Sequence, residues 1–86
     1  MAVTSAQVRM ARAALNWTVR DLAVATGLHR NTITNIEVGR YAGDPKTLAA
    51  IAKVLMRSGI EFIDENGGGL GVRLKMRRER RRDERG

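Results

Sequence analysis

Residues 17–39 constrain the fold more than any other stretch, because they predict two short helices joined by a tight turn. Thr18 is a favourable N-cap for the first of these helices, and apolar residues follow it at helical spacing. Gly27 ends that helix, since glycine stops a regular helical pattern. Ile33 and Ile36 repeat at helical spacing in the second helix and are expected to face inward. The second helix is predicted to run from about Arg30 to Val38.

The remaining periodicities predict two more helices and a β-hairpin. A capping box at Thr4 begins a helix that runs from about Ser5 to Leu15. Asp44-Pro45 begins another helix, which ends near Arg57 or Ser58. After Gly59 the period changes to two, which predicts strands on either side of a glycine-rich turn. The fold class is therefore mainly α, with about four helices over 1–58, a C-terminal β-hairpin over 59–76 (strands at about 60–64 and 71–76) and a basic disordered tail over 77–86.

The charge of the chain is strongly positive and unevenly distributed. The formal net charge is +7, and about half of it falls within residues 75–86. A basic chain suggests an acidic partner, either nucleic acid or an anionic membrane surface. The chain has no cysteine and a single histidine, so we expect no metal site and no cofactor. No long apolar run begins the chain, and so we expect a cytoplasmic protein without a membrane segment.

The predicted helix that begins at Arg30 carries polar side chains on its outward face. Arg30, Asn31, Thr34 and Asn35 lie together there, because positions i, i+1, i+4 and i+5 share one face of a helix. Arginine can bind guanine O6 and N7 with two hydrogen bonds, and asparagine can bind adenine N6 and N7 in the same way. An ordinary solvated helix face is the alternative. The absence of acidic residues between Arg30 and Ile36 favours base contact, because a carboxylate there would face the DNA phosphates.

A family resemblance rests on the run Thr18-x-x-x-Leu22-Ala23-x-x-x-Gly27-Leu28-x-x-x-Thr32-Ile33-x-x-Ile36-Glu37-x-Gly39, which is similar to the lambda-repressor-like, XRE-type helix-turn-helix family. The likeness covers residues 5 to about 57, and it implies a domain that binds double-stranded DNA with the second helix of the motif in the major groove. Arg30, Asn31 and Asn35 match the base-contacting positions of the family, and Thr34 shares their face. The residues expected to bind phosphate are Thr18, His29, Thr32, Arg40, Tyr41 and Lys46.

The resemblance also implies an ion pair between Arg12 and Glu37, which would hold the first helix against the third; Arg12 on a phosphate is the alternative. Two positions depart from the family pattern. Val19 stands where glutamine is common, and its side chain cannot hydrogen-bond a phosphate. His29 stands where serine is common, and it is expected to be a poorer N-cap.

The hairpin offers a strand edge with which a second copy of the chain can pair. Ile60, Phe62, Val72 and Leu74 are the candidate dimer contacts, unless the hairpin folds back on its own helices. Together these features predict a homodimeric, nucleoid-associated repressor that binds a palindromic operator. One alternative is an antitoxin-like or anti-activator protein whose hairpin and tail bind a protein partner. Another is a non-specific DNA- or RNA-binding protein that uses mainly its tail.

Overall fold

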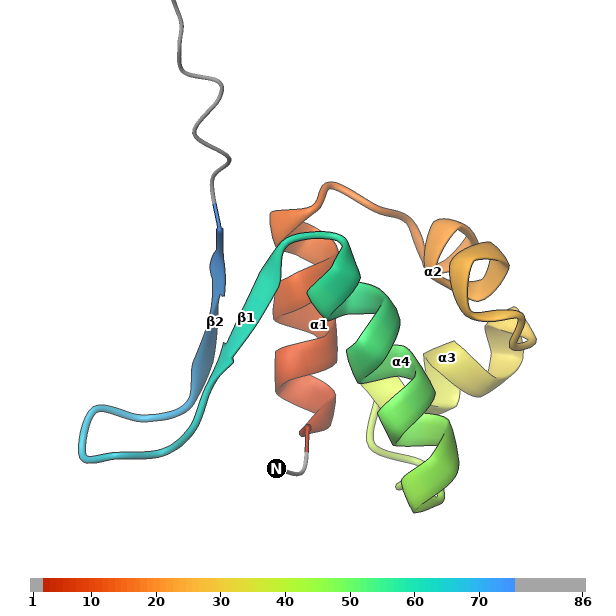
Figure 1. Cartoon of the computed structure of the whole chain (residues 1–86). Coiled ribbons are helices and arrows are strands. Elements are labelled where there is room, and N and C mark those ends of the chain that lie inside the picture. Colours follow the sequence, from red (N-terminus) through yellow and green to blue (C-terminus); the bar gives the residue numbers. More distant parts are fainter. Residues whose placement is uncertain (1–2, 76–86) are drawn as a thin grey trace, which may run out of the picture.

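The computed structural model describes residues 3–75, which form four helices followed by a two-stranded antiparallel hairpin (Figure 1). The helices are α1 (Ser5–Ala14), α2 (Val19–Thr26), α3 (Arg30–Glu37) and α4 (Pro45–Arg57), and the strands are β1 (Ile60–Ile63) and β2 (Gly71–Leu74). The predicted mainly helical fold with a C-terminal hairpin is confirmed. The basic tail expected over 77–86 lies outside the described residues.

Capping side chains explain where the helices begin. Thr4 Oγ1 accepts a hydrogen bond from the backbone N–H of Gln7 (3.1 Å), and Gln7 Oε1 accepts one from the N–H of Thr4 (3.1 Å). Thr18 and Asp21 make the same reciprocal pair at the start of α2. Asp44 Oδ1 accepts from the N–H of the third residue of α4 (2.8 Å), and this bond holds the pKa of Asp44 below its ordinary value. Each cap satisfies backbone donors that the first turn of a helix leaves free.

The ends of the elements differ from the predictions by one or two residues. α1 ends at Ala14, because Leu15 closes the last hydrogen bond to Ala11 and Asn16 then turns left-handed with φ at 61°. β1 ends at residue 63 instead of 64, and β2 ends at residue 74 instead of 76. A hydrogen bond from the N–H of Lys75 to the carbonyl of Gly59 (2.7 Å) extends the strand pairing beyond β2. These differences leave the helix faces as predicted.

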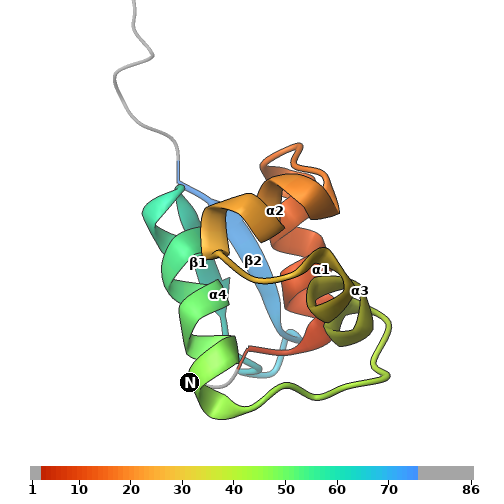
Figure 2. The ribbon, with the colours of Figure 1, turned by 90° about the vertical axis from the view of Figure 1, so that its right-hand side faces the viewer.

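One apolar core joins all four helices to the hairpin. α2 and α3 pack against each other, α3 also contacts α1, and α2 also contacts α4 (Figure 2). Leu28, in the turn, and Trp17, at the corner between α1 and α2, are partly buried against this core. Its largest fully buried apolar side chains are Val8, Leu22, Ile33, Ile36, Ile51, Leu55 and Ile60. The core therefore fixes the orientation of α3, which carries the predicted binding face.

The hairpin packs on α1 and α4, on the side away from α2 and α3 (Figures 1 and 2). Ile60 pairs with Leu74 and Phe62 with Val72, so these four side chains share one face of the hairpin. Ile60 was expected to contact a second copy of the chain, but its side chain is 1% exposed and lies in the core of its own chain. Phe62 and Val72 are also packed against that core. Of the four expected dimer residues, Leu74 alone is exposed.

Gln7 ties the hairpin to α1 through its side-chain amide. Nε2 donates one hydrogen bond to the carbonyl of Ile63 (3.1 Å) and another to the carbonyl of Gly71 (3.0 Å). These two carbonyls belong to the strand pair next to the hairpin turn. Because Gln7 is 1% exposed, water cannot replace its amide in those contacts. The same side chain therefore caps α1 and holds the hairpin on it.

Candidate nucleic-acid interface

α3 separates its apolar and polar side chains onto two faces. Ile33 and Ile36 are buried in the core. Arg30, Asn31 and Thr34 are exposed, as expected for residues that read bases. Asn35 is half-buried and so lies at the margin of that face, and Thr32 is half-buried as well. The exposed face carries no carboxylate, which leaves it free to approach DNA phosphates.

The turn between α2 and α3 is fixed by a left-handed glycine and a histidine cap. Gly27 has a φ of 77°, and its N–H donates to the carbonyl of Ala23 (2.9 Å). His29 Nδ1 accepts a hydrogen bond from the backbone N–H of Asn31 (3.0 Å), so the imidazole serves as the N-cap of α3. We assign the remaining ring proton to Nε2 because Nδ1 is the acceptor. The exposed Nε2–H of His29 can then donate to a phosphate.

Arg12 and Glu37 form the expected ion pair, and it is bidentate. Arg12 Nε and Nη2 donate to the two carboxylate oxygens of Glu37 at 2.8 and 2.9 Å. Arg12 Nη1 donates to the carbonyl of Trp17 (2.9 Å), and Arg9 donates to the carbonyl of Glu37. The hydrogen bond to Glu37 raises the pKa of Arg12 above its ordinary value, so the guanidinium stays charged at every pH of interest. The ion pair holds the C-terminal end of α3 against α1.

The loop after α3 brings Arg40 beside the predicted reading face. The backbone N–H groups of Arg40 and Tyr41 both donate to the carbonyl of Asn35, at 2.9 and 3.1 Å. Arg40 Nη1 also lies 3.4 Å from Asn35 Oδ1. Asn35 therefore shares its side-chain oxygen with Arg40 and keeps its amide N–H groups free to donate. Sequence reasoning placed Arg40 near the DNA backbone, but it did not anticipate this contact.

The other residues expected to bind phosphate are placed less uniformly. Thr18, Tyr41 and Lys46 are exposed, and the hydroxyl oxygen of Thr18 is already occupied as the cap of α2. Its hydroxyl hydrogen remains available to a phosphate. Val19 is partly buried against the core, so its side chain stabilises the fold instead of facing a ligand. Among the described residues, no salt bridge joins Lys46 to α3.

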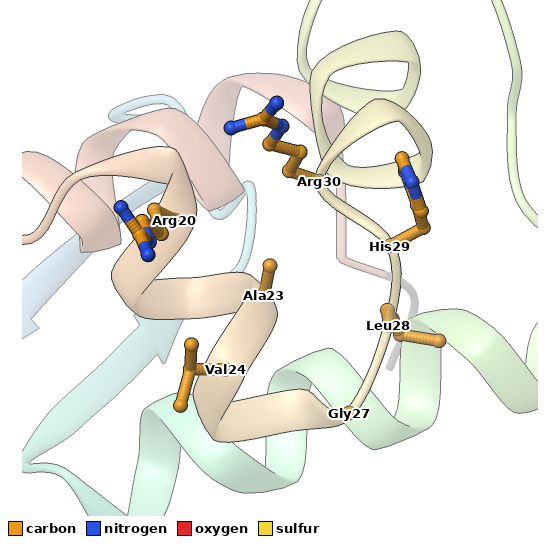
Figure 3. Close-up of a pocket in the computed structure, with 7 residues that line it drawn as sticks. All are labelled: Arg20, Ala23, Val24, Gly27, Leu28, His29 and Arg30. Carbon is orange, nitrogen blue, oxygen red and sulfur yellow. The ribbon is translucent and has the colours of Figure 1, made fainter.

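An arginine that sequence reasoning missed stands across from Arg30. Arg20 of α2 and Arg30 of α3 line opposite sides of an open hollow between the two helices, with Val24 and His29 also at its wall (Figure 3). The guanidinium of Arg30 extends over this hollow toward the side of Arg20 (Figure 3). A cation in the first turn of α2 was the only sequence signal for Arg20. Its position opposite Arg30 depends on how α2 and α3 pack.

No helix within residues 3–75 is long and apolar enough to span a bilayer. In the same part of the chain, His, Asp and Glu side chains do not gather in a group of three that could hold a metal.

The fold and the polar face of α3 together define a helix-turn-helix DNA-binding domain. A model of the helix-turn-helix family matches residues 8–61, which is more than half of the chain. The chain belongs to this family, in its XRE-type form, and is therefore a transcription regulator that binds double-stranded DNA. A search for similar curated proteins found no match.

Proposed function

We propose that the protein is a sequence-specific transcriptional repressor that binds a palindromic operator as a homodimer. The observation that supports this most directly is the acid-free, exposed face of α3, whose opposite face is anchored in the core by Ile33 and Ile36. A rigid helix with such a face can enter the major groove and present side chains to base edges. Two copies of α3 about one helical turn apart, roughly 34 Å, would occupy successive major grooves and block access of the polymerase.

Within this proposal, the residues divide into base readers and phosphate ligands. Arg30 binds a guanine, and Asn31 and Asn35 bind adenines, with Thr34 in contact with a neighbouring base. Asn35 can donate and accept at once because Arg40 occupies only part of its oxygen. The residues that hold the DNA backbone are Thr18, His29, Thr32, Arg40, Tyr41 and Lys46.

The dimer requires a surface that the folded monomer leaves apolar and exposed. Leu74 at the end of β2 and Leu70 in the preceding turn are exposed large apolar side chains of the hairpin. We propose that the dimer contact involves Leu74 together with the free edges of the two strands, because the inner face of the hairpin is used by its own core.

Selection from a random duplex library at about 150 mM salt, followed by sequencing, tests the proposal. A repressor of this kind should enrich a motif with two-fold symmetry, whose half-site spacing follows from the dimer. Binding without an enriched motif would contradict sequence specificity. An enriched motif without symmetry would contradict the homodimer.

We expect Arg30→Ala to relax base preference at one position of each half-site. The loss of a bidentate contact to guanine should reduce discrimination at that position by about 1–3 kcal/mol, while the other positions keep their preference. The selected motifs of the variant and the wild-type protein give this result directly. If Arg30→Ala selects an unchanged motif, Arg30 does not read a base.

We expect Arg40→Ala to weaken binding to all sequences alike. Its guanidinium is exposed beside Asn35, and the loss of one phosphate contact should lower the slope of log affinity against log salt by about one unit. Affinity measured at several salt concentrations, on the selected operator and on an unrelated duplex, checks this. A loss confined to the operator would show that Arg40 acts on base recognition, through Asn35, and not on the backbone.

A further inference from the structure

Arg20 has the properties of a DNA-binding residue, although it lies outside the recognition helix. It is exposed, and no carboxylate in the described part of the chain lies within salt-bridge distance of it. The neighbouring carboxylate of Asp21 is directed to the backbone N–H of Thr18, at 2.8 Å. The charge of Arg20 is therefore not neutralised by the fold.

The position of Arg20 along α2 is unfavourable for the stability of the helix. Arg20 is the second residue of α2, and Arg30 is the first residue of α3. The helix dipole is positive at these ends and favours an anion there, so a cation in the first turn weakens the helix. Both helices carry an arginine at this end, and both arginines border the same hollow (Figure 3). Local preferences broken in this way are expected at functional sites.

The hollow has the chemistry of a site for a sugar-phosphate segment. Its lining combines the apolar side chains of Ala23, Val24 and Leu28 with two guanidinium groups and the imidazole of His29. No carboxylate lines it. The N-terminus of α3 adds positive potential to that of the side chains. An anion in the hollow would be attracted by both guanidinium groups, and the apolar part of the lining suits a deoxyribose.

We propose that Arg20 binds a backbone phosphate of the operator at the edge of the major groove in which Arg30 reads its base. The inference rests on the proposed DNA-binding mode and adds a ligand from α2 to it. The hollow between α2 and α3 then receives the adjoining sugar. Arg20 and Arg30 bind the same DNA strand from the two helices of the motif. Arg20 thus takes the place of the phosphate clamp that the side chain of Val19 cannot provide.

The test compares Arg20→Ala with Arg20→Lys, which keeps the charge. Arg20→Ala should bind every duplex about fivefold more weakly at about 150 mM salt and lose about 0.9 unit of salt slope, as one phosphate contact predicts. Arg20→Lys should keep the slope. Because a cation leaves the N-terminus of α2, the thermal midpoint of Arg20→Ala should stay equal or rise. A weaker variant that is also less stable would overturn the assignment.

A scan of neutral methylphosphonate linkages along the selected half-site locates the contact. On the one duplex in which a neutral linkage replaces the partner phosphate of Arg20, Arg20→Ala and the wild-type protein should bind with equal affinity. Arg20→Ala can be tested on an operator that the wild-type protein selects. If it binds there with wild-type affinity and salt slope, the role of Arg20 is refuted and the proposed function stands. A changed base preference in Arg20→Ala would overturn the phosphate assignment. A wild-type protein that selects no motif would overturn both proposals.

Discussion

Arg12→Ala should lower the free energy of unfolding by about 3 kcal/mol, because it leaves the carboxylate of Glu37 buried without its partner. Glu37 is 4% exposed, and both of its carboxylate oxygens accept hydrogen bonds from Arg12. The substitution also removes the donor to the carbonyl of Trp17, where α1 connects to α2. A domain of this size has only about 4–11 kcal/mol of stability, so the loss is a large part of the total. Urea unfolding followed by circular dichroism measures it.

The double variant Arg12→Ala/Glu37→Gln separates the charge from the packing. It should recover part of the loss, because a neutral amide in the same place avoids the desolvation of an unpaired charge. Arg9→Ala is the control from the same helix, since Arg9 is exposed and donates a hydrogen bond to the backbone carbonyl of Glu37, not to its carboxylate. Its cost should be about 1 kcal/mol. If Arg12→Ala costs no more than Arg9→Ala, the ion pair does not hold α3 on α1.

The helices and their faces were predictable because their signals are local. Thr4 and Gln7, or Thr18 and Asp21, are three residues apart, and their capping bonds depend on that spacing alone. The inward direction of Ile33 and Ile36 follows from helical periodicity. The docking of the hairpin depends on contacts between residues 56 and 64 positions apart, as in the bonds of Gln7 to Ile63 and Gly71. No local sequence pattern predicts such a contact.

In the predicted binding face, too, the residues with local signals were predictable and those that depend on helix packing were not. Arg30, Asn31 and Thr34 were found from their spacing, and the structure places them together on the exposed side of α3. Arg20 was missed because its relation to Arg30 arises from the packing of two helices. His29 was judged a weak cap from its residue type, whereas its ring nitrogen accepts the bond that a serine oxygen would accept. Residue preferences are averages, and the conformation of one turn can override them.

Gln7→Leu should lower the free energy of unfolding by roughly 2–4 kcal/mol, since two carbonyls then lose their donor in a place closed to water. Leucine has a similar volume, so the apolar packing around position 7 should change little. The variant also loses the acceptor that completes the capping box with Thr4. Thr4→Ala removes the cap alone and should cost about 1 kcal/mol, which makes it the matched control. Equal losses in the two variants would show that apolar packing alone holds the hairpin.

Gln7→Glu tests the direction of the same hydrogen bonds. A glutamate keeps the acceptor for Thr4, but its carboxylate would face the carbonyls of Ile63 and Gly71 with no proton to donate. The neutral acid can donate one bond, so this variant should gain stability relative to the wild-type protein as the pH falls through the titration of the carboxyl group. Unfolding measured as a function of pH shows this as a slope opposite to that expected from Asp44, whose lowered pKa favours the folded state above its titration. A pH-independent difference between Gln7→Glu and the wild-type protein would mean that residue 7 reaches water and does not hold the hairpin on α1.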